Sequence, residues 1–263
     1  MSTLTYAVRD SRTMLRRELL RAWRYPAMTL QLIGIPAILL LLFVYVFGGA
    51  MGAGITGGAG SRAEYVDYVL PGILLLSIAI GSTGTAVSVA MDMTEGIIAR
   101  FKTMAIFRPS VLAGHVVGST TQTVIGLALL IGVGLLIGFR PNATPLEWLA
   151  VAGLLVAISF AITWLSVALG LSAKTVEGAS NLPMPLILLP FLGSGFVPPE
   201  SMPTAVAWFA EHQPFTPMMD TLRGLLLGTP IGNDGWIAVG WCVVITVVGY
   251  VWARRLYNRD PSR

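Results

Sequence analysis

Few side chains in this chain have the types and spacing that catalysis requires. Ser194, in the sequence LGSGF, is one candidate nucleophile, but a serine needs a histidine base within hydrogen-bond reach. The two histidines are His115 and His212. We expect His115 at the inner end of the third apolar segment and Ser194 near the outer end of the fifth. The Gly-Ser-Gly sequence therefore fits helix packing or a helix C-terminus better than catalysis, and we predict that the chain is not an enzyme.

Metal and nucleotide chemistry have as little support in the sequence. Cys242 is the single cysteine, which excludes an internal disulfide and a cysteine zinc site. His212 has no second histidine nearby, so we predict no metal site. The phosphate-binding pattern GxxxxGK[ST] requires Gly-Lys, and neither Lys102 nor Lys174 follows a glycine. We therefore predict that this chain binds no cofactor of its own.

Residues 91–110, MDMTEGIIARFKTMAIFRPS, form a charged stretch between two apolar segments. Only 11% of the chain is charged, yet this stretch contains Asp92, Glu95, Arg100, Lys102 and Arg108. On a helix, one apolar face would be formed by Ile97, Ile98, Phe101, Met104 and Ala105. Ile106 and Phe107 would emerge on the other side. Such a helix can bury one face on its own protein and offer the other to a partner; the alternative is a solvated charged loop.

The overall composition indicates an integral membrane protein. Of the 263 residues, 55% are hydrophobic and the mean hydropathy is +0.75, whereas a soluble domain would have roughly a quarter charged residues. Six apolar segments can be marked: 27–47, 68–90, 112–139, 148–171, 182–197 and 236–252. Most reach the roughly 20 residues that a transmembrane helix needs. The fifth is short and is broken by prolines at 183, 185 and 190. We predict an all-α fold with six transmembrane helices.

The distribution of basic residues predicts the orientation of these helices. With both termini cytoplasmic, the inside segments are 1–26, 91–111, 172–181 and 253–263. Of the seventeen lysines and arginines, only Arg62, Arg140 and Arg223 lie elsewhere. This is the bias expected when Lys and Arg flank the cytoplasmic ends of spans. We therefore predict one transmembrane domain over 27–253 and a basic cytoplasmic tail over 254–263.

Residues 1–26 have the pattern of a helix that lies in the membrane interface. On a helix, Val8, Leu15, Leu19, Ala22 and Trp23 gather on one face. The other face is mostly Arg16, Arg17, Arg21 and Arg24. Arginines on one side and apolar residues on the other favour contact with anionic lipid headgroups. An ordinary positive flank that orients the protein is compatible with the same residues.

The third apolar segment contains a polar run between small residues. Ser119, Thr120, Gln122 and Thr123 belong to this run. Two GxxxG patterns flank it, Gly114 with Gly118 and Gly134 with Gly138, where helices can approach closely. The polar side chains would form helix–helix hydrogen bonds or face a transport path or subunit interface. The sequence leaves both interpretations open.

Residues 196–234 are too apolar for a plain loop and too rich in proline for a span. Two short helices can be expected, over 205–211 and 218–227. Irregular backbone at membrane depth is tolerated only where protein covers it or where it lines a wet cavity. We therefore predict a re-entrant or interfacial cap on the outer side, before the last span.

Three stretches together resemble a known family over nearly the whole chain. They are DMTEGIIARFK with RP at 108–109, the short loop KTVEG at 174–178, and GFVP…MP…HQPFTP…DTLRGLLLG between 195 and 228. In these stretches the sequence resembles a permease subunit of an ABC exporter, of the type-2 family that includes daunorubicin-resistance permeases. The resemblance places a cytoplasmic coupling helix between spans two and three. It implies ATPase coupling by Asp92, Glu95, Gly96, Ile97, Arg100, Phe101, Lys102, Met104, Arg108 and, more weakly, Glu177, and an outer cap with Pro198, Pro203, Gln213, Pro214, Asp220 and Arg223.

The resemblance also implies partners and a task. Two copies of a separate ABC ATPase would hold ATP and Mg²⁺, and a second permease copy or a paralogous permease would complete the complex in a bacterial plasma membrane. The cargo would be an amphipathic or hydrophobic drug, antibiotic or lipid, which corresponds to multidrug efflux or lipid export. A polysaccharide or glycolipid translocator of the same family is the nearest alternative, and a non-transporting scaffold or sensor is another. We expect membrane lipids as contacts and no nucleic acid partner.

Overall fold

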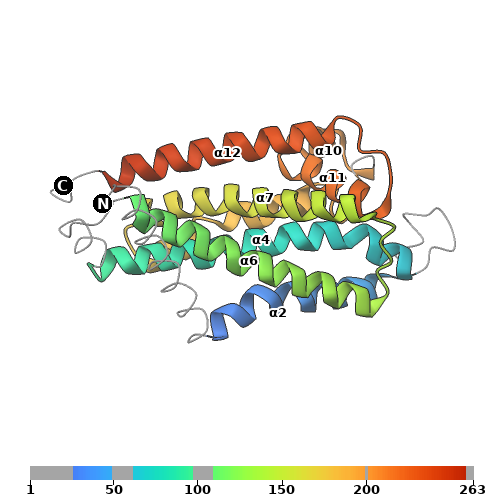
Figure 1. Cartoon of the computed structure of the whole chain (residues 1–263), viewed down its shortest axis with the longest axis horizontal. Helices are drawn as coiled ribbons and strands as arrows, with labels where there is room; N and C mark the ends of the chain where they lie inside the picture. The colour runs from blue at the N-terminus through green and yellow to red at the C-terminus, as the bar shows by residue number, and fades with distance from the viewer. Residues whose placement is uncertain (1–25, 49–61, 97–108, 199–200, 259–263) are drawn as a thin grey trace.

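The computed structural model describes residues 26–48, 62–96, 109–198 and 201–258, which form an elongated bundle of helices (Figure 1). No strand occurs within these ranges, as expected for an all-α protein. The elements are α2 (Pro26–Leu42), the π-helix η1 (Phe43–Phe47), α4 (Arg62–Thr94), α6 (Pro109–Ile137), α7 (Pro145–Ser172), α8 (Val176–Asn181), α9 (Met184–Leu188), the 3₁₀ helix η2 (Leu189–Leu192), α10 (Thr204–His212), α11 (Phe215–Leu227) and α12 (Asp234–Tyr257). The interfacial helix predicted within 1–26 and the coupling residues between 97 and 108 fall outside the described side chains.

Four helices are long and apolar enough to cross a membrane: Ala63–Thr94, Leu112–Ile137, Pro145–Ser172 and Asp234–Tyr257. They coincide with the second, third, fourth and sixth predicted spans. Two shorter apolar helices, Ile33–Phe47 and Val176–Leu192, coincide with the first and fifth. The fifth is divided into short helices: Pro183 precedes α9, and Pro190 lies in η2. Proline interrupts a helix because it cannot supply the amide hydrogen that a continuous helix needs. The helical positions are thus confirmed, and six spans remain a prediction.

Helix α7 lies at the centre of the bundle, where it contacts α4, α6, α11 and α12. Its start is defined locally by the sequence TPLE. The Thr144 Oγ1 accepts a hydrogen bond from the Glu147 amide (3.3 Å), and the Glu147 carboxylate accepts one from the Thr144 amide (2.6 Å). This capping box, with Pro145 at the first helical position, satisfies amide groups that the first turn leaves without partners.

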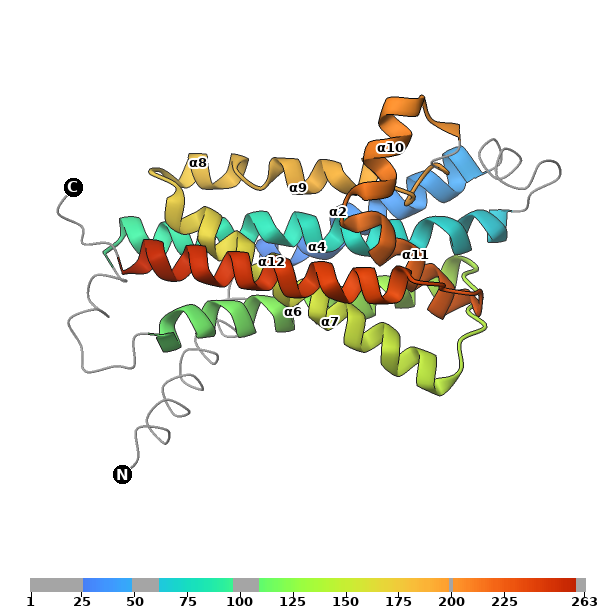
Figure 2. The ribbon, with the colours of Figure 1, turned by 90° about the horizontal axis from the view of Figure 1, so that it is seen from above.

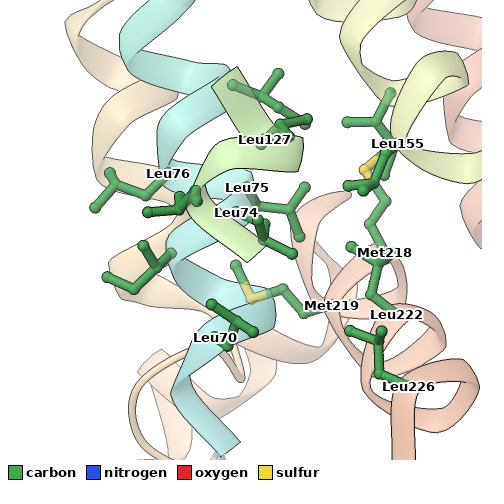
Figure 3. Packing of buried hydrophobic residues seen from close by; sticks show 14 of the residues in the cluster. Leu70, Leu74, Leu75, Leu76, Leu127, Leu155, Met218, Met219, Leu222 and Leu226 are labelled. Carbon is green, nitrogen blue, oxygen red and sulfur yellow. The ribbon is translucent and has the colours of Figure 1, made fainter. Parts of the chain in front are cut away.

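Helix α11 is a core element of the bundle. Met218, Met219, Leu222 and Leu226 are fully buried, and Figure 3 shows them among leucines of α4, α6 and α7. The two short helices predicted before the last span do form, as α10 and α11. Helix α11 is therefore covered by protein on the face that carries these residues.

Three glycines allow backbone segments to approach closely. A Cβ added at Gly72 of α4 would lie 2.7 Å from the Gly195 carbonyl oxygen, and one at Gly170 of α7 would lie 2.5 Å from the Ala86 oxygen. At Gly249 of α12, a Cβ would lie 2.7 Å from the Leu165 amide nitrogen. A side chain at Gly170 or Gly249 would push two helices apart, and one at Gly72 would displace the segment after η2.

The GxxxG pattern at 134 and 138 contributes differently from the prediction. Gly134 packs against the Leu70 side chain, as a close-contact residue should. Gly138 lies just beyond α6 with φ +117°, and a Cβ there would meet nothing within 4 Å. Its role is to turn the chain, since side chains disfavour positive φ.

The two ends of the bundle differ chemically (Figures 1 and 2). At one end α4, α7 and α12 finish and α6 begins, and Lys174, Arg254 and Arg255 lie there, exposed. We call this the basic end. The opposite end carries α10 and α11, and we call it the cap end.

Candidate functional site

At the basic end, Gly96 ends α4 and turns the chain into the predicted coupling stretch. The Glu95 amide donates to the Met91 carbonyl (2.9 Å), and the Gly96 amide donates to the Met93 carbonyl (3.2 Å). Gly96 has φ +69°, the left-handed conformation in which glycine commonly ends a helix. Gly96 therefore has a backbone role, whereas the Glu95 side chain is exposed.

Asp92, predicted to take part in coupling, points into the protein. Asp92 is 2% exposed, and His115 of α6 is 1% exposed. The His115 Nε2 lies 3.1 Å from the Asp92 Oδ2. With Asp92 ionised, its carboxylate accepts this hydrogen bond and Nε2 donates it. The sequence suggested no partner for His115, because 23 positions separate the two residues.

The Asp92–His115 pair adjoins a small apolar core that joins four helices. Val89 of α4 and Leu112 and Val116 of α6 pack in one cluster with residues of α7 and α12. Those residues are Trp164, Val167, Ala168, Leu171, Ala253 and Tyr257. A buried hydrogen bond beside apolar side chains is costly to break.

The second predicted coupling loop also lies at the basic end. Glu177 is exposed in the first turn of α8, and α8 contacts α4. The Thr175 Oγ1 accepts a hydrogen bond from the Gly178 amide (3.0 Å) and so caps α8. Among the predicted coupling residues, Ile97, Arg100, Phe101, Lys102, Met104 and Arg108 are not among those described.

At the cap end, Arg223 of α11 lies at the centre of a polar network. Its Nη1 donates to Asp220 Oδ1 (2.6 Å), and its Nη2 donates to the Ser194 carbonyl (2.7 Å). The guanidinium also lies 4.2 Å from the centre of the Tyr68 ring, a cation–π arrangement. We call these four residues the Arg223 network.

Ser194 and Tyr68 complete this network. The Ser194 hydroxyl donates to Asp220 Oδ1 (2.7 Å), and the Tyr68 hydroxyl donates to the Ser194 carbonyl (2.9 Å). The network thereby joins the start of α4, the segment after η2, and α11. Ser194 has a carboxylate partner and is 3% exposed; its contacts fit a packing role.

A cavity of about 450 Å³ adjoins the Arg223 network. It is lined by Tyr68, Ser194, Pro198, Glu211, Thr216, Asp220, Arg223 and Asp234. Three of these residues are acidic and one is basic. The cavity is thus polar, and its lining includes Glu211 of α10 and Thr216 of α11.

The remaining predicted cap residues organise α10 and α11. Pro203 and Pro214 stand immediately before these helices, where a missing amide hydrogen removes no intrahelical hydrogen bond. Gln213 is buried, and its Oε1 accepts from the Phe215 amide (3.0 Å) while its Nε2 donates to Thr216 Oγ1 (2.9 Å). Pro198 lines the cavity. The cap is therefore a hydrogen-bonded unit.

Comparison with known proteins identifies the family. The profile of the ABC-2 type transporter family matches residues 9–227. The chain belongs to the ABC-2 type transporter family. It is 31% identical over 225 residues to the daunorubicin resistance ABC transporter permease protein DrrB1 of Streptomyces coeruleorubidus, covering 85% of this chain and 77% of that protein. It is 29% identical over 194 residues to the probable doxorubicin resistance ABC transporter permease protein DrrC of Mycobacterium tuberculosis, covering 69% and 68%.

The chain is thus an ABC-2 type permease and a multi-pass membrane protein. In this permease the polar run of α6 divides between faces. Thr120 and Thr123 are buried, whereas Ser119 and Gln122 are half-buried. The Thr121 hydroxyl donates to the Val117 carbonyl of the same helix (2.7 Å). Neither a transport path nor a subunit interface follows from this placement.

Buried hydroxyl residues on α7 were not singled out by sequence reasoning. Ser159, Thr163 and Ser166 lie within the permease, and two of them donate to carbonyls one turn earlier on α7. Their spacing of four and then three residues places them on one helical face. That spacing is the signal that could have found them.

Proposed function

We propose that this permease is the membrane subunit of an ATP-driven exporter that moves amphipathic or hydrophobic drugs, antibiotics or lipids from the cytoplasm or inner leaflet. The main support is the family match across most of the chain, together with relatives named as drug resistance permeases. The bundle contributes a second argument: at the cap end the Arg223 network ties α4, the segment after η2 and α11 together. In the proposed exporter, cargo that leaves at the cap end would have to pass these contacts.

The proposed orientation has six spans, with both termini and the basic end in the cytoplasm of a bacterium. Lys174, Arg254 and Arg255 support it, since basic residues favour the cytoplasmic flank. The two shorter apolar helices would complete the first and fifth spans. The cap would then be a re-entrant outer segment.

Reaction of introduced cysteines with a membrane-impermeant maleimide tests this orientation. In a Cys242→Ser background, Thr229→Cys should react in intact cells, because Thr229 lies exposed beside the cap. Lys174→Cys should react only after the membrane is opened. The reverse pattern would overturn the orientation.

The energy would come from two copies of a separate ABC ATPase, which would hold ATP and Mg²⁺, bound to two permeases. Residues 92–108 would transmit the movement, with Glu177 as a lesser contact. Glu95 and Glu177 are exposed at the basic end, where a partner can reach them. A second copy of this chain or a paralogous permease would complete the complex.

The decisive experiment is purification of the permease with the ATPase encoded beside it. We expect a stable complex whose ATP hydrolysis rises with anthracyclines or with lipids, and ATP-dependent uptake of the same compounds into inverted vesicles. A complex that binds ATPase but moves no cargo would indicate a scaffold or sensor. If only glycolipid or polysaccharide substrates stimulated ATP hydrolysis, the chain would instead be assigned as a translocator of those compounds.

A further inference from the structure

The Asp92–His115 pair brackets the stretch that the proposed function assigns to coupling. Asp92 lies two residues before the end of α4, and His115 is the seventh residue of α6. Residues 97–108 connect these two helices in the sequence. A force applied to that stretch therefore enters the bundle through α4 and α6.

The Asp92–His115 pair is buried, whereas residues next to it in the sequence are exposed. Asp92 and His115 are at most 2% exposed, whereas Met93 of α4 and Val117 of α6 are 45% and 44% exposed. A partner docked on the basic end can reach Glu95 without reaching Asp92. The 3.1 Å contact joins the two helices to each other.

The helix ends are in turn coupled to the rest of the bundle. Val89, one turn before Asp92, packs in the same apolar cluster as Leu112 and Trp164. Gly170 of α7 lies against the Ala86 backbone, with no space for a side chain between them. Because such tightly packed contacts transmit displacement, a joint movement of α4 and α6 reaches α7.

We propose that the Asp92–His115 pair is an internal strut that makes the ends of α4 and α6 move together, so that Asp92 is a positioning residue for coupling and not a contact for the ATPase. This inference rests on the proposed function, in which residues 92–108 receive the movement of the ATPase. Removing one partner takes this buried hydrogen bond from the other. The two helix ends then move separately, and ATP hydrolysis no longer produces export.

The first experiment measures binding, ATP hydrolysis and export in the complete permease–ATPase complex. The variants are Asp92→Ala, His115→Leu, His115→Gln and the exchange Asp92→His with His115→Asp. Met93→Ala and Val117→Ala are controls, since their side chains are exposed on the same helical turns. We expect the disrupting variants to retain the ATPase, to change hydrolysis by less than about twofold and to lose export by about tenfold.

The conservative variants distinguish positioning from contact with the ATPase. His115→Gln keeps a donor, and the exchange restores a histidine–carboxylate pair, so both should recover export to within about threefold of the wild type. Loss of ATPase binding in Asp92→Ala, without recovery in the exchange variant, would assign Asp92 to the partner interface and overturn the proposal. Full export by Asp92→Ala and His115→Leu would also overturn it.

A second experiment needs no transport, and so separates this proposal from the proposed function. Spin labels at Met93→Cys and Val117→Cys, in a Cys242→Ser background diluted with unlabelled protein, report the distance between the two helix ends. We expect one narrow distance distribution, broadened by His115→Leu and narrowed again by His115→Gln. If His115→Leu left the distance distribution unchanged, the strut would be refuted even in an active exporter. If His115→Leu broadened the distribution but the complex exported nothing, only the proposed function would be refuted.

Discussion

Arg223 stands out at the scale of single residues because its side chain joins three segments of the chain. Its side chain is 17% exposed and that of Asp220 is 31% exposed, so water replaces little of what the guanidinium contributes. Hydrogen bonds to charged groups contribute about 1.5–3 kcal/mol each when their loss leaves a partner unsatisfied. We therefore expect Arg223→Ala to lower the free energy of unfolding by about 2–3 kcal/mol, measured by thermal unfolding in detergent.

The matched control for Arg223 is Glu211→Gln. Glu211 lines the same cavity but is exposed, so its loss should change stability by less than about 0.5 kcal/mol. Arg223→Lys keeps the charge but cannot reproduce the planar guanidinium. Its loss of stability should therefore lie between those of Arg223→Ala and Glu211→Gln. Equal melting temperatures for Arg223→Ala and Glu211→Gln would indicate that the Arg223 network does not stabilise the cap.

Glu95 provides the corresponding prediction at the basic end. Its side chain is exposed beside Gly96, so Glu95→Ala should leave folding unchanged while reducing ATPase-driven export by about tenfold. The measurement is export per ATP hydrolysed in the purified complex. Arg100→Ala should behave in the same way. Normal export by both variants would indicate that the charged stretch is only solvated.

The sequence alone could not have paired these residues. The loop at 174–178 and the prolines at 203 and 214 indicated where helices end and begin, because those signals are local. The contacts of Asp92 with His115 and of Tyr68 with Ser194 join positions 23 and 126 residues apart. Which helical faces meet at such distances depends on tertiary packing, which a single sequence does not encode in any local pattern.

At the scale of elements, the close helix contacts predict opposite effects for two glycines of α4. Gly72→Ala would place a methyl group 2.7 Å from the Gly195 oxygen, whereas Gly84 has nothing within 4 Å of a Cβ. Overpacking typically costs about 1–3 kcal/mol. Replacing an unconstrained helical glycine by alanine stabilises by about 0.5–1 kcal/mol. We expect Gly72→Ala to melt earlier than the wild type and Gly84→Ala to melt later.

The same comparison can be repeated on α12, where Gly249 contacts α7 and Gly240 has open space around it. Gly249→Ala should destabilise and Gly240→Ala should not. If both pairs of variants melted alike, the helices would not approach as closely as described. The apolar runs predicted the helices themselves, but GxxxG spacing drew attention to α6, while these closest approaches involve α4, α7 and α12.

At the scale of the whole molecule, the single cysteine reports whether the bundle is assembled. Cys242 is 4% exposed and belongs to the main apolar core, whereas its neighbour Val243 is 57% exposed on the outer surface of α12. A thiol in a close-packed core reacts only after the core opens. An apolar, fluorogenic maleimide should therefore label Cys242 along a single cooperative thermal transition that coincides with loss of the bundle.

The matched control moves the thiol by one position, as Val243→Cys in a Cys242→Ser background. On the outer surface, an apolar reagent dissolved in the micelle should reach it well below the melting temperature. Adjacent helical residues point about 100° apart, so the two variants test which face of α12 is turned toward the core. If Cys242 reacted early and residue 243 stayed protected, a different face of α12 would be turned toward the core. The described packing of α12 on α7 would then be wrong.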